Sequence, residues 1–441
     1  MSEAAETPAQ QASAQFTPRY RQYVLGILVV VYVFNFIDRQ ILSILLQPIK
    51  QDLELSDTQL GFLSGIAFAV FYVGFGIPLA RLADRSSRVN IISASLAVWS
   101  AMTAVCGLAQ NFWQLLAARI GVGIGEAGCA PPSYSLISDY FAPEQRATAL
   151  SIFSLGVPLG VMFGFLAGGW IEEYFGWRTA FIVVGLPGLI LAVIVRMAVK
   201  EPPRGHSEAI QDRGEQMRLK EVVGYLWSRR AFRHTALAAG LHAFVGYGVI
   251  GWLPSFLARS HQMSSAEIGT WLALLAGIVG GLGTVAGGYL GDRYARRDRR
   301  WYVWISGISL LLAVPFTIFA FLAESKYWML SLYILPTFFG AFYHGPTLAV
   351  IQGVAQVRMR AFAGAAYVFV VNLIGLGLGP LAVGVLSDFL RPSLENESLR
   401  YALLVIFMVN IWSAVHYFFA ARTLREDLDA NPDKNAVYAS S

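Results

Sequence analysis

The sequence predicts an all-α, polytopic membrane protein with twelve transmembrane helices in two pseudo-symmetric six-helix bundles. Of its 441 residues, 56% are hydrophobic and only 14% are charged, whereas a soluble domain has about 25% charged residues. Apolar blocks of about 20 or more residues recur along the chain, as helices that cross a bilayer require. The second half of the chain also repeats short motifs of the first, which predicts the division into two bundles.

The twelve apolar blocks define the predicted helices, which are numbered here by their order in the chain. Each is long enough to cross a hydrocarbon core of about 30 Å. They span residues 22–48, 58–82, 89–109, 113–138, 146–172, 178–199, 233–258, 267–291, 300–322, 327–354, 360–388 and 399–422.

The distribution of basic residues predicts the orientation of these helices. With both termini on the cytoplasmic side, 25 of the 33 Lys and Arg fall in cytoplasmic segments and 6 in external ones. This is the bias that the positive-inside rule describes. The net charge of +5 therefore reflects topology and does not indicate a nucleic-acid partner. We expect a monomer in the bacterial inner membrane, in contact with membrane lipids, with both termini in the cytoplasm.

The segments outside the apolar blocks complete the predicted domain organisation. The polar, Ala/Gln-rich start predicts a disordered tail without a cleavable signal peptide, so the first helix would be the insertion signal. The longest connection contains "RLKEVVGYLWSRR", which fits either an amphipathic helix on the membrane surface or a solvated linker helix. The predicted domains are a tail at 1–21, a bundle at 22–199, a linker at 200–232, a bundle at 233–422 and a tail at 423–441.

Three pairs of motifs, in the same order and about 208 to 220 residues apart, indicate an internal duplication. In the first pair, "ARLADRSSR" (80–88) follows the second helix and "GYLGDRYARR" (288–297) follows the eighth, so that each places Asp-Arg at a helix exit. Parallel repeats of six helices are a property of one class of secondary transporters. The other pairs are "PEQRATALSIF" (143–153) with "VRMRAFAGAAY" (357–367), and "GVPLGVMFG" (156–164) with "GLGLGPLAVG" (375–384).

On these motifs the chain resembles the major facilitator superfamily across essentially its whole length. The two Asp-Arg loops match the superfamily's signature loop, although Ala80, Ser87 and Ala295 replace its usual glycines. "NFIDRQ" (35–40) and "RIGVGIGEAGCAPPSYSLISDYFAPEQRATALS" (119–151) resemble Spinster-type transporters. The resemblance implies the major facilitator fold, alternating access and a lysophospholipid- or sphingolipid-like substrate. Organic-anion permeases share related motifs and stay open as an alternative.

Ionisable residues inside the predicted membrane helices are the first functional candidates, because charge at the bilayer centre costs several kcal/mol. Four charged residues lie well away from the ends of their predicted helices: Asp38, Arg39, Arg119 and Glu126. Asp38 and Arg39 point about 100° apart on their helix and cannot simply neutralise each other. Arg119 and Glu126 share one face, about 10 Å apart along the axis. These groups form either a network facing a central cavity or a buried ion-pair cluster that only fixes helix one against helix four.

The residue types predict a role for each member of this network. Glu126 is the candidate proton carrier, with Asp38 as the second, because burial and neighbouring arginines act on a carboxyl group in opposite directions. Arg39 and Arg119 are the candidates for an anionic substrate group, since a guanidinium fork matches carboxylate or phosphate geometry. The other predicted substrate-binding residues are Asn35, Tyr343 and Tyr367.

Charged residues at the cytoplasmic helix ends form a second predicted set. The resemblance implies that such loops act as a latch that stabilises one access state, whereas the positive-inside rule alone would also place arginines there. The predicted latch residues are Asp84, Arg85, Arg146, Asp292, Arg293 and Arg360. In helix seven, "GYGVIGWLP" (246–254) predicts a discontinuity of the kind that lines binding sites.

The absence of catalytic motifs favours a transporter over an intramembrane enzyme or a channel. The sequence has no His-Glu-x-x-His zinc pattern, no Gly-x-Ser-x-Gly elbow and no P-loop. We therefore expect no metal, no cofactor and no ATP, but a proton gradient as the driving force. The predicted function is proton-coupled transport of an amphiphilic anionic or zwitterionic solute. An organic-anion/proton symporter and a multidrug/proton antiporter of the same superfamily are the alternatives.

Overall fold

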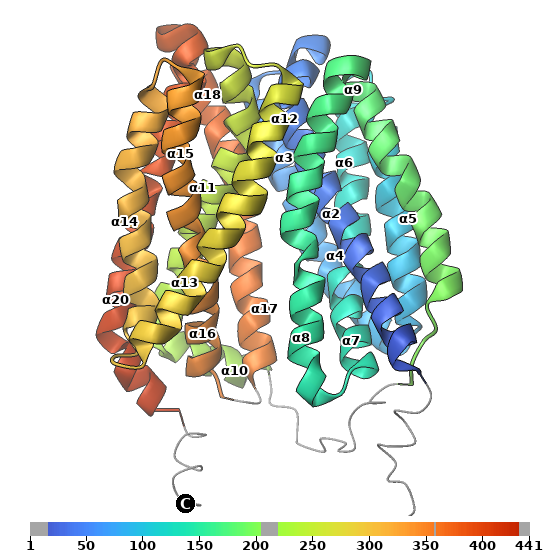
Figure 1. The fold of residues 1–441 in the computed structure, drawn as a ribbon, viewed down its shortest axis with the longest axis vertical. Coiled ribbons are helices and arrows are strands. Elements are labelled where there is room, and N and C mark those ends of the chain that lie inside the picture. Colours follow the sequence, from blue (N-terminus) through green and yellow to red (C-terminus); the bar gives the residue numbers. More distant parts are fainter. Residues whose placement is uncertain (1–15, 204–218, 357–358, 432–441) are drawn as a thin grey trace, which may run out of the picture. The chain divides into compact units, whose positions relative to one another are not determined.

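The computed structural model describes residues 16–203, 219–356 and 359–431, and these residues form helices and turns but no strand. The all-α prediction is therefore confirmed (Figure 1). Packing divides the chain into two compact units, Met1–Leu45 with Val70–Glu215, and Leu46–Ala69 with Gln216–Ser441. The segment Leu46–Ala69 thus comes from the first half of the sequence and packs with the second half. The predicted division into 22–199 and 233–422 stays a prediction.

In the first unit, short polar side chains fix the starts of two helices. Ser87 caps α5 by accepting a hydrogen bond from the backbone N–H of Asn90, and Asn111 caps α6 through Gln114, as such residues commonly do. The helices that contribute to this unit are α2 (Pro18–Leu53), α4 (Ile66–Arg85), α5 (Arg88–Cys106), α6 (Phe112–Glu126), α7 (Ala130–Tyr140), α8 (Pro143–Ser154) and α9 (Gly156–Ala198).

The second unit begins with α3 (Asp57–Ser64), whose first turn is closed by a capping box between Ser56 and Gln59. Two π turns interrupt its later helices, at Leu275–Val279 and Val371–Leu378. The remaining helices are α10 (Leu219–Ser228), α11 (Arg230–His261), α12 (Ser265–Leu274), α13 (Gly280–Ala295), α14 (Trp301–Leu322), α15 (Lys326–Gly340), α16 (His344–Val354), α17 (Arg360–Val370), α18 (Gly379–Leu394), α19 (Ser398–Phe407) and α20 (Val409–Asp429), with 3₁₀ turns at Ala341–Tyr343 and Glu395–Glu397.

The lengths of the helices account for the twelve predicted membrane passes. Within the described residues, nine helical stretches are long and apolar enough to span a membrane. Two of them, Thr148–Ala198 and Phe362–Asp429, have 51 and 68 residues, which is about twice the length one pass needs. The first turns at Gly176 (φ 78°) and the second at Glu395 (φ 46°). The predicted helix four is divided into α6 and α7, and each of these is too short to be counted as a membrane span by itself. Twelve passes are therefore consistent with the structure.

A stripe of glycines on α9 allows α2 to approach it closely, and the two helices run side by side in Figure 1. Gly156, Gly160, Gly164 and Gly168 face successive turns of α2. A Cβ atom at Gly160 would lie 2.6 Å from the carbonyl oxygen of Val33, and one at Gly164 would lie 2.8 Å from the Cβ of Gln40. The position of α2 therefore depends on these residues having no side chain, as in other small-residue helix contacts in membranes.

Replacing Gly160 with valine is expected to destabilise the first unit by about 1–3 kcal/mol, the usual cost of overpacking. The added atoms would meet the backbone of α2, which cannot rotate away as a side chain can. The midpoint of thermal unfolding in detergent measures the effect. Gly74→Ala in α4 is the matched control, because nothing lies within 4 Å of a Cβ there. An equal loss of stability in both variants would show that the close contact is unimportant.

The second unit repeats this glycine contact with its own helices. A Cβ atom at Gly375 would lie 2.6 Å from the Cβ of Ala243 in α11, and one at Gly379 would lie 3.0 Å from the backbone nitrogen of Gly248.

The predicted discontinuity in helix seven is wrong, since α11 is continuous through Pro254. A proline removes only one helix hydrogen bond, and packing holds the helix here: Trp252 donates a 2.8 Å hydrogen bond to the carbonyl of Pro380.

The segments at the ends and in the connection differ from their predicted limits. Helix α2 begins at Pro18, inside the predicted tail, and α20 continues to Asp429; residues 1–15, 204–218 and 432–441 of the predicted tails and linker lie outside the described residues. In α10, Leu226 is buried and Trp227 is 67% exposed.

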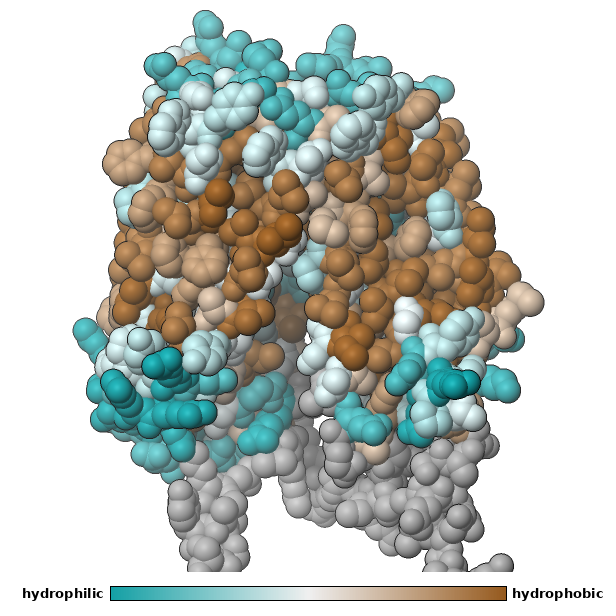
Figure 2. Space-filling view, in the orientation of Figure 1, coloured by the Kyte–Doolittle hydropathy of each residue, from teal (hydrophilic) through white to brown (hydrophobic). Residues whose placement is uncertain are grey.

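On the face drawn in Figure 2, hydrophobic side chains cover the middle of the helices and hydrophilic ones their ends, as an integral membrane protein requires.

Candidate functional site

A buried ion pair joins α2 to α6 in the first unit. The Nε atom of Arg39 donates to the Oε2 atom of Glu126 over 2.5 Å. Glu126 is 1% exposed, so this carboxyl group has no contact with bulk water. Asn35, one turn before Arg39 on α2, is buried and lies beside the same carboxyl group. The structure thus brings together three of the predicted site residues.

Asp38 points about 100° away from Arg39 on α2 and faces α5 and α6. It is 1% exposed and lies within electrostatic range of both Arg119 and Glu126. Trp99 and Thr103 of α5 approach it, but no described residue forms a well-aligned hydrogen bond with either carboxyl oxygen. The buried site therefore contains two acids and two arginines.

An aromatic wall surrounds the guanidinium group of Arg39. Its central carbon lies 4.6 Å from the ring centre of Tyr72 and 5.0 Å from that of Phe36. Tyr32 stacks on Phe153 with ring centres 4.3 Å apart. Sequence reasoning missed this wall, although the spacing of Tyr32, Phe36 and Arg39 at i, i+4 and i+7 indicates one helix face. An arginine among aromatic rings suits a ligand that has both a charged and an apolar part.

A break in helix four directly follows Glu126. Residues 127–129 form turns between α6 and α7. Pro131 and Pro132 lack the N–H groups that would bond the carbonyls of Ala127 and Gly128 in a continuous helix. Glu126 is therefore the last residue of α6 and lies next to backbone that is not helical. Membrane proteins tolerate such breaks mainly where they line a site or a cavity.

The two predicted tyrosines lie in the second unit, within its hydrophobic core. Tyr343 and Tyr367 are both buried. The ring of Tyr343 lies 4.4 Å from that of His242, whose Nε2 is 3.0 Å from the carbonyl of Gly340 and whose Nδ1 is 2.8 Å from Oδ1 of Asn410. Tyr343 and Tyr367 thus pack within the core of the second unit. Their role in substrate binding stays a prediction.

The predicted latch residues are spread over several helix ends. Asp84 and Arg85 are exposed at the end of α4, and Arg146 donates to the carbonyl of Ser138 over 3.0 Å. Asp292 accepts a hydrogen bond from the hydroxyl of Tyr302 over 2.9 Å. Arg293 contacts the hydroxyl of Tyr289, and Arg360 is exposed at the start of α17. No ion pair joins two of these six residues within the described part of the chain.

Arg88 is the centre of a charge cluster at this end of the first unit. It is 2% exposed and pairs with Asp139 of α7 and with Glu201, whose Oε1 lies 2.7 Å from its Nε. Burial opposes ionisation of Glu201, but hydrogen bonds from Val89, Arg88 and Ser87 outweigh it and lower its pKa. Arg88 is the last residue of the repeated motif "ARLADRSSR", but sequence reasoning missed both acids, because neither belongs to a repeated motif.

A second charge cluster, in the second unit, was not predicted. Asp57, which is 1% exposed, accepts two 2.8 Å hydrogen bonds from the guanidinium of Arg259 and further ones from Lys50 and from Ser387 (2.7 Å). Asp388 accepts from the backbone N–H groups of Asp57 and Thr58. The cluster joins the start of α3 to α11 and α18. "LSDTQL" resembles an ordinary helix start, so only the fold reveals this role.

Three comparisons with known proteins agree with this architecture. The sequence pattern of the Major Facilitator Superfamily matches residues 28–380 and also 236–440. An "MFS-type efflux pump" of Mycolicibacterium smegmatis is 32% identical over 93% of this chain and 95% of that protein. The "Sphingosine-1-phosphate transporter SPNS2" of Xenopus tropicalis is 26% identical over 91% of this chain and 82% of its own length.

A solved structure is similar to the whole fold. It is that of a bacterial homolog to the human lysosomal transporter Spinster, in an inward-facing and unoccupied conformation. It superimposes with a TM-score of 0.87 at 34% sequence identity, covering 93% of this chain and 99% of that one. The similarity therefore extends over both halves of the sequence.

Proposed function

Because the chain belongs to the Major Facilitator Superfamily, and is thus a transporter and not an enzyme, we propose that it couples protons to the movement of an amphiphilic anionic or zwitterionic solute. The observation that carries the proposal is the buried pair of Arg39 and Glu126 beside Asp38 and Arg119. No motif for nucleotide hydrolysis occurs in the sequence, so the driving force is an ion gradient.

Charge balance supports the coupling of proton and solute at this site. With both acids ionised, the two negative and two positive charges cancel. One added proton leaves one arginine charge uncompensated, and an anionic group on the solute can compensate it. Conversely, an ionised Glu126 competes with the solute for Arg39. Proton and solute thus act on the same electrostatic balance, which is what coupling requires.

The surroundings of Arg39 support an amphiphile as the solute. A guanidinium fork matches a phosphate or carboxylate group, and the rings of Phe36 and Tyr72 next to it offer an apolar surface. The name of one relative, a sphingosine-1-phosphate transporter, describes a molecule with both parts. We propose a lysophospholipid- or sphingolipid-like solute for this chain. Asn35, Tyr343 and Tyr367 are proposed as further solute-binding residues.

A multidrug/proton antiporter is the second candidate, favoured by the efflux pump that is 32% identical. In that case a cationic solute would replace the proton at Glu126, and the rings beside Arg39 would hold its apolar or cationic part. The two candidates differ in the sign of the charge that the solute carries. They also differ in whether an inward proton gradient drives uptake or efflux.

Transport into vesicles reconstituted with the purified protein tests the proposal. A fluorescent lysophospholipid and a lipophilic cationic dye are compared, with and without a pH gradient. We expect gradient-dependent movement of the lysophospholipid above that in protein-free vesicles. Movement of the dye alone would support the antiporter, and no effect of the gradient on either solute would contradict proton coupling.

The orientation and the latch belong to the same proposal. We place both termini and the Arg-rich ends of α4 and α13 in the cytoplasm of a bacterial cell, with the protein acting as a monomer in the inner membrane. Asp84, Asp292 and the neighbouring arginines are then proposed to stabilise one access state. The excess of basic residues on that side supports this orientation.

A further inference from the structure

The loop between α13 and α14 carries more arginine than its own acids can neutralise. Asp298, at its centre, accepts hydrogen bonds from Arg300 and from the Nε and Nη2 atoms of Arg425 in α20, at 3.2 and 2.7 Å. The hydrogen bond from Arg300 lowers the pKa of Asp298 to about 2. Asp298 is therefore ionised at neutral pH, and its negative charge is paired with Arg300 and Arg425. Arg296, Arg297 and Arg299 have no ion-pair partner among the described residues.

The corresponding loop of the first unit shows that this excess is not a general property of the repeat. There, Arg88 is buried and paired with the two acids Asp139 and Glu201. The charge of Arg88 is therefore neutralised inside the protein, whereas Arg85 of the same loop is exposed. In the second unit, the arginine side chains of 296–299 are exposed and their charge faces outward.

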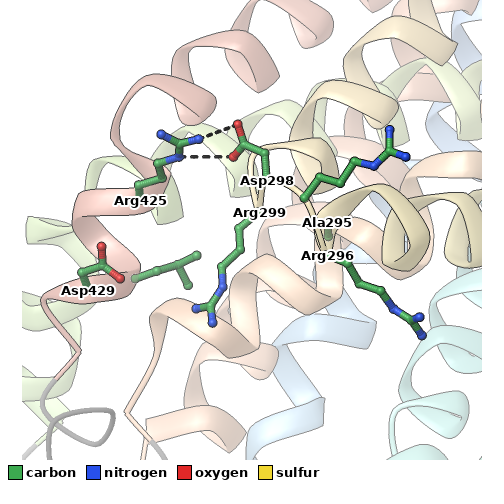
Figure 3. A pocket seen from close by; sticks show the side chains of 8 residues that line it. Ala295, Arg296, Asp298, Arg299, Arg425 and Asp429 are labelled. Carbon is green, nitrogen blue, oxygen red and sulfur yellow. Dashed lines mark hydrogen bonds and ion pairs between the residues drawn. The ribbon is translucent and has the colours of Figure 1, made fainter.

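A cavity of about 280 Å³ lies between this loop and the end of α20. It is lined by Arg296, Arg297 and Arg299 of the loop and by Arg425, Leu428 and Asp429 of α20. Figure 3 shows the fork of Arg425 turned to Asp298, and Arg299 extended toward the end of α20, whereas Arg296 points away. Arg425 uses two of its nitrogens for Asp298, so Nη1 remains for a ligand. The lining has four arginines against two aspartates, and is thus positive.

Aromatic residues indicate the depth of this cavity in a membrane. The rings of Tyr294 and Trp301 lie 4.9 Å apart, and those of Trp301 and Trp304 lie 5.5 Å apart. The guanidinium of Arg300 lies 4.6 Å from the ring centre of Trp304. Such Trp and Tyr clusters at helix ends mark the level of the lipid headgroups. Basic pockets between helices at this level are suited to the phosphate of an anionic lipid.

We propose that this cavity binds the headgroup of an anionic phospholipid, with the phosphate held by Arg299 and the remaining nitrogen of Arg425. Leu428 in the cavity wall contacts the apolar part of the same lipid. Asp429 limits the site to one phosphate, because a second negative charge would lie against its carboxylate. The site is separate from the buried pair of Arg39 and Glu126, which lies in the other unit.

Thermal unfolding of the full chain in detergent tests the proposal. The probes are phosphatidylglycerol, phosphatidylcholine with the same acyl chains, and inorganic phosphate. We expect only phosphatidylglycerol to raise the unfolding midpoint at low concentration. Arg299→Gln should weaken its apparent affinity about tenfold, the effect of losing one charged hydrogen bond. Arg422→Gln, one turn from Arg425 but outside the cavity, removes the same charge from an exposed position of α20 and should leave the affinity unchanged.

The same titration in an Arg39→Ala background separates this site from the proposed transport site. The Arg299-dependent part of the response should persist there. Equal affinity for phosphatidylglycerol in the wild type and in Arg299→Gln would overturn the proposal. Equal stabilisation by phosphatidylcholine would show a response to acyl chains alone, and equal stabilisation by phosphate would show a site for a free anion; either result also overturns it.

Discussion

Replacing Glu126 with glutamine is expected to abolish the response of transport to a pH gradient while the protein still folds and binds its solute. Glutamine has the shape of glutamate and its amide oxygen can accept the 2.5 Å hydrogen bond from Arg39. It cannot take up or release a proton, and the site would keep one uncompensated arginine charge at any pH. Pumping against a gradient would therefore stop, whereas exchange of solute across the membrane would continue.

Flux into reconstituted vesicles, measured with and without a pH gradient, gives this result directly. Asp38→Asn is the matched control, since it removes the second buried acid by the same chemical change. Arg39→Ala should instead weaken solute binding by about 1.5–3 kcal/mol, as expected for one charged hydrogen bond. Arg39→Lys should restore only part of that loss, because an ammonium lacks the planar fork. An intact pH response in Glu126→Gln would move the role of proton carrier to Asp38.

Replacing Arg259 with alanine is expected to lower the stability of the second unit by about 3–5 kcal/mol, the effect of removing one partner of a buried ion pair. Asp57 is 1% exposed and accepts hydrogen bonds from both Nη atoms of Arg259. Without the guanidinium, its carboxylate would keep only Lys50 and Ser387 as side-chain partners. The start of α3 would then separate more easily from α11 and α18.

The unfolding midpoint in detergent measures this loss, and two further variants interpret it. Lys326→Ala breaks an ion pair with Glu267 whose side chains are 30% and 29% exposed, so it should lower the midpoint much less than Arg259→Ala does. The double variant Asp57→Asn, Arg259→Gln should recover part of the stability, because no unpaired carboxylate remains. Equal effects of Arg259→Ala and Lys326→Ala would contradict a special role for the Asp57 cluster.

The candidate site was only partly accessible to sequence reasoning. Asp38, Arg39, Arg119 and Glu126 were found because charge is rare in apolar blocks, and that signal is local. The pairing of Arg39 with Glu126 connects residues 87 positions apart, and no spacing rule applies over that distance. The aromatic neighbours Tyr72 and Phe153 were missed for the same reason, since they come from other helices.

Proline and glycine patterns had two different outcomes. Pro131 and Pro132 break helix four beside Glu126, whereas Pro254 leaves α11 continuous. Two consecutive prolines leave two carbonyls without a helix bond, and one proline leaves one. The glycines of α9 belong to a repeated motif, and the structure shows them as points of close contact with α2. Their effect depends on what lies opposite, which a single sequence does not contain.

The sequence by itself determined the all-α membrane fold, its twelve passes and its internal duplication, because length, hydropathy and repeated motifs are properties of contiguous residues. It also identified the four charges within apolar blocks that need a partner. Only the tertiary structure decided the partners: Glu126 for Arg39, Asp139 and Glu201 for Arg88, and Arg259 for Asp57. An ion pair forms where helices distant in sequence pack together, and that packing is the sum of many contacts along each helix, not the property of one motif.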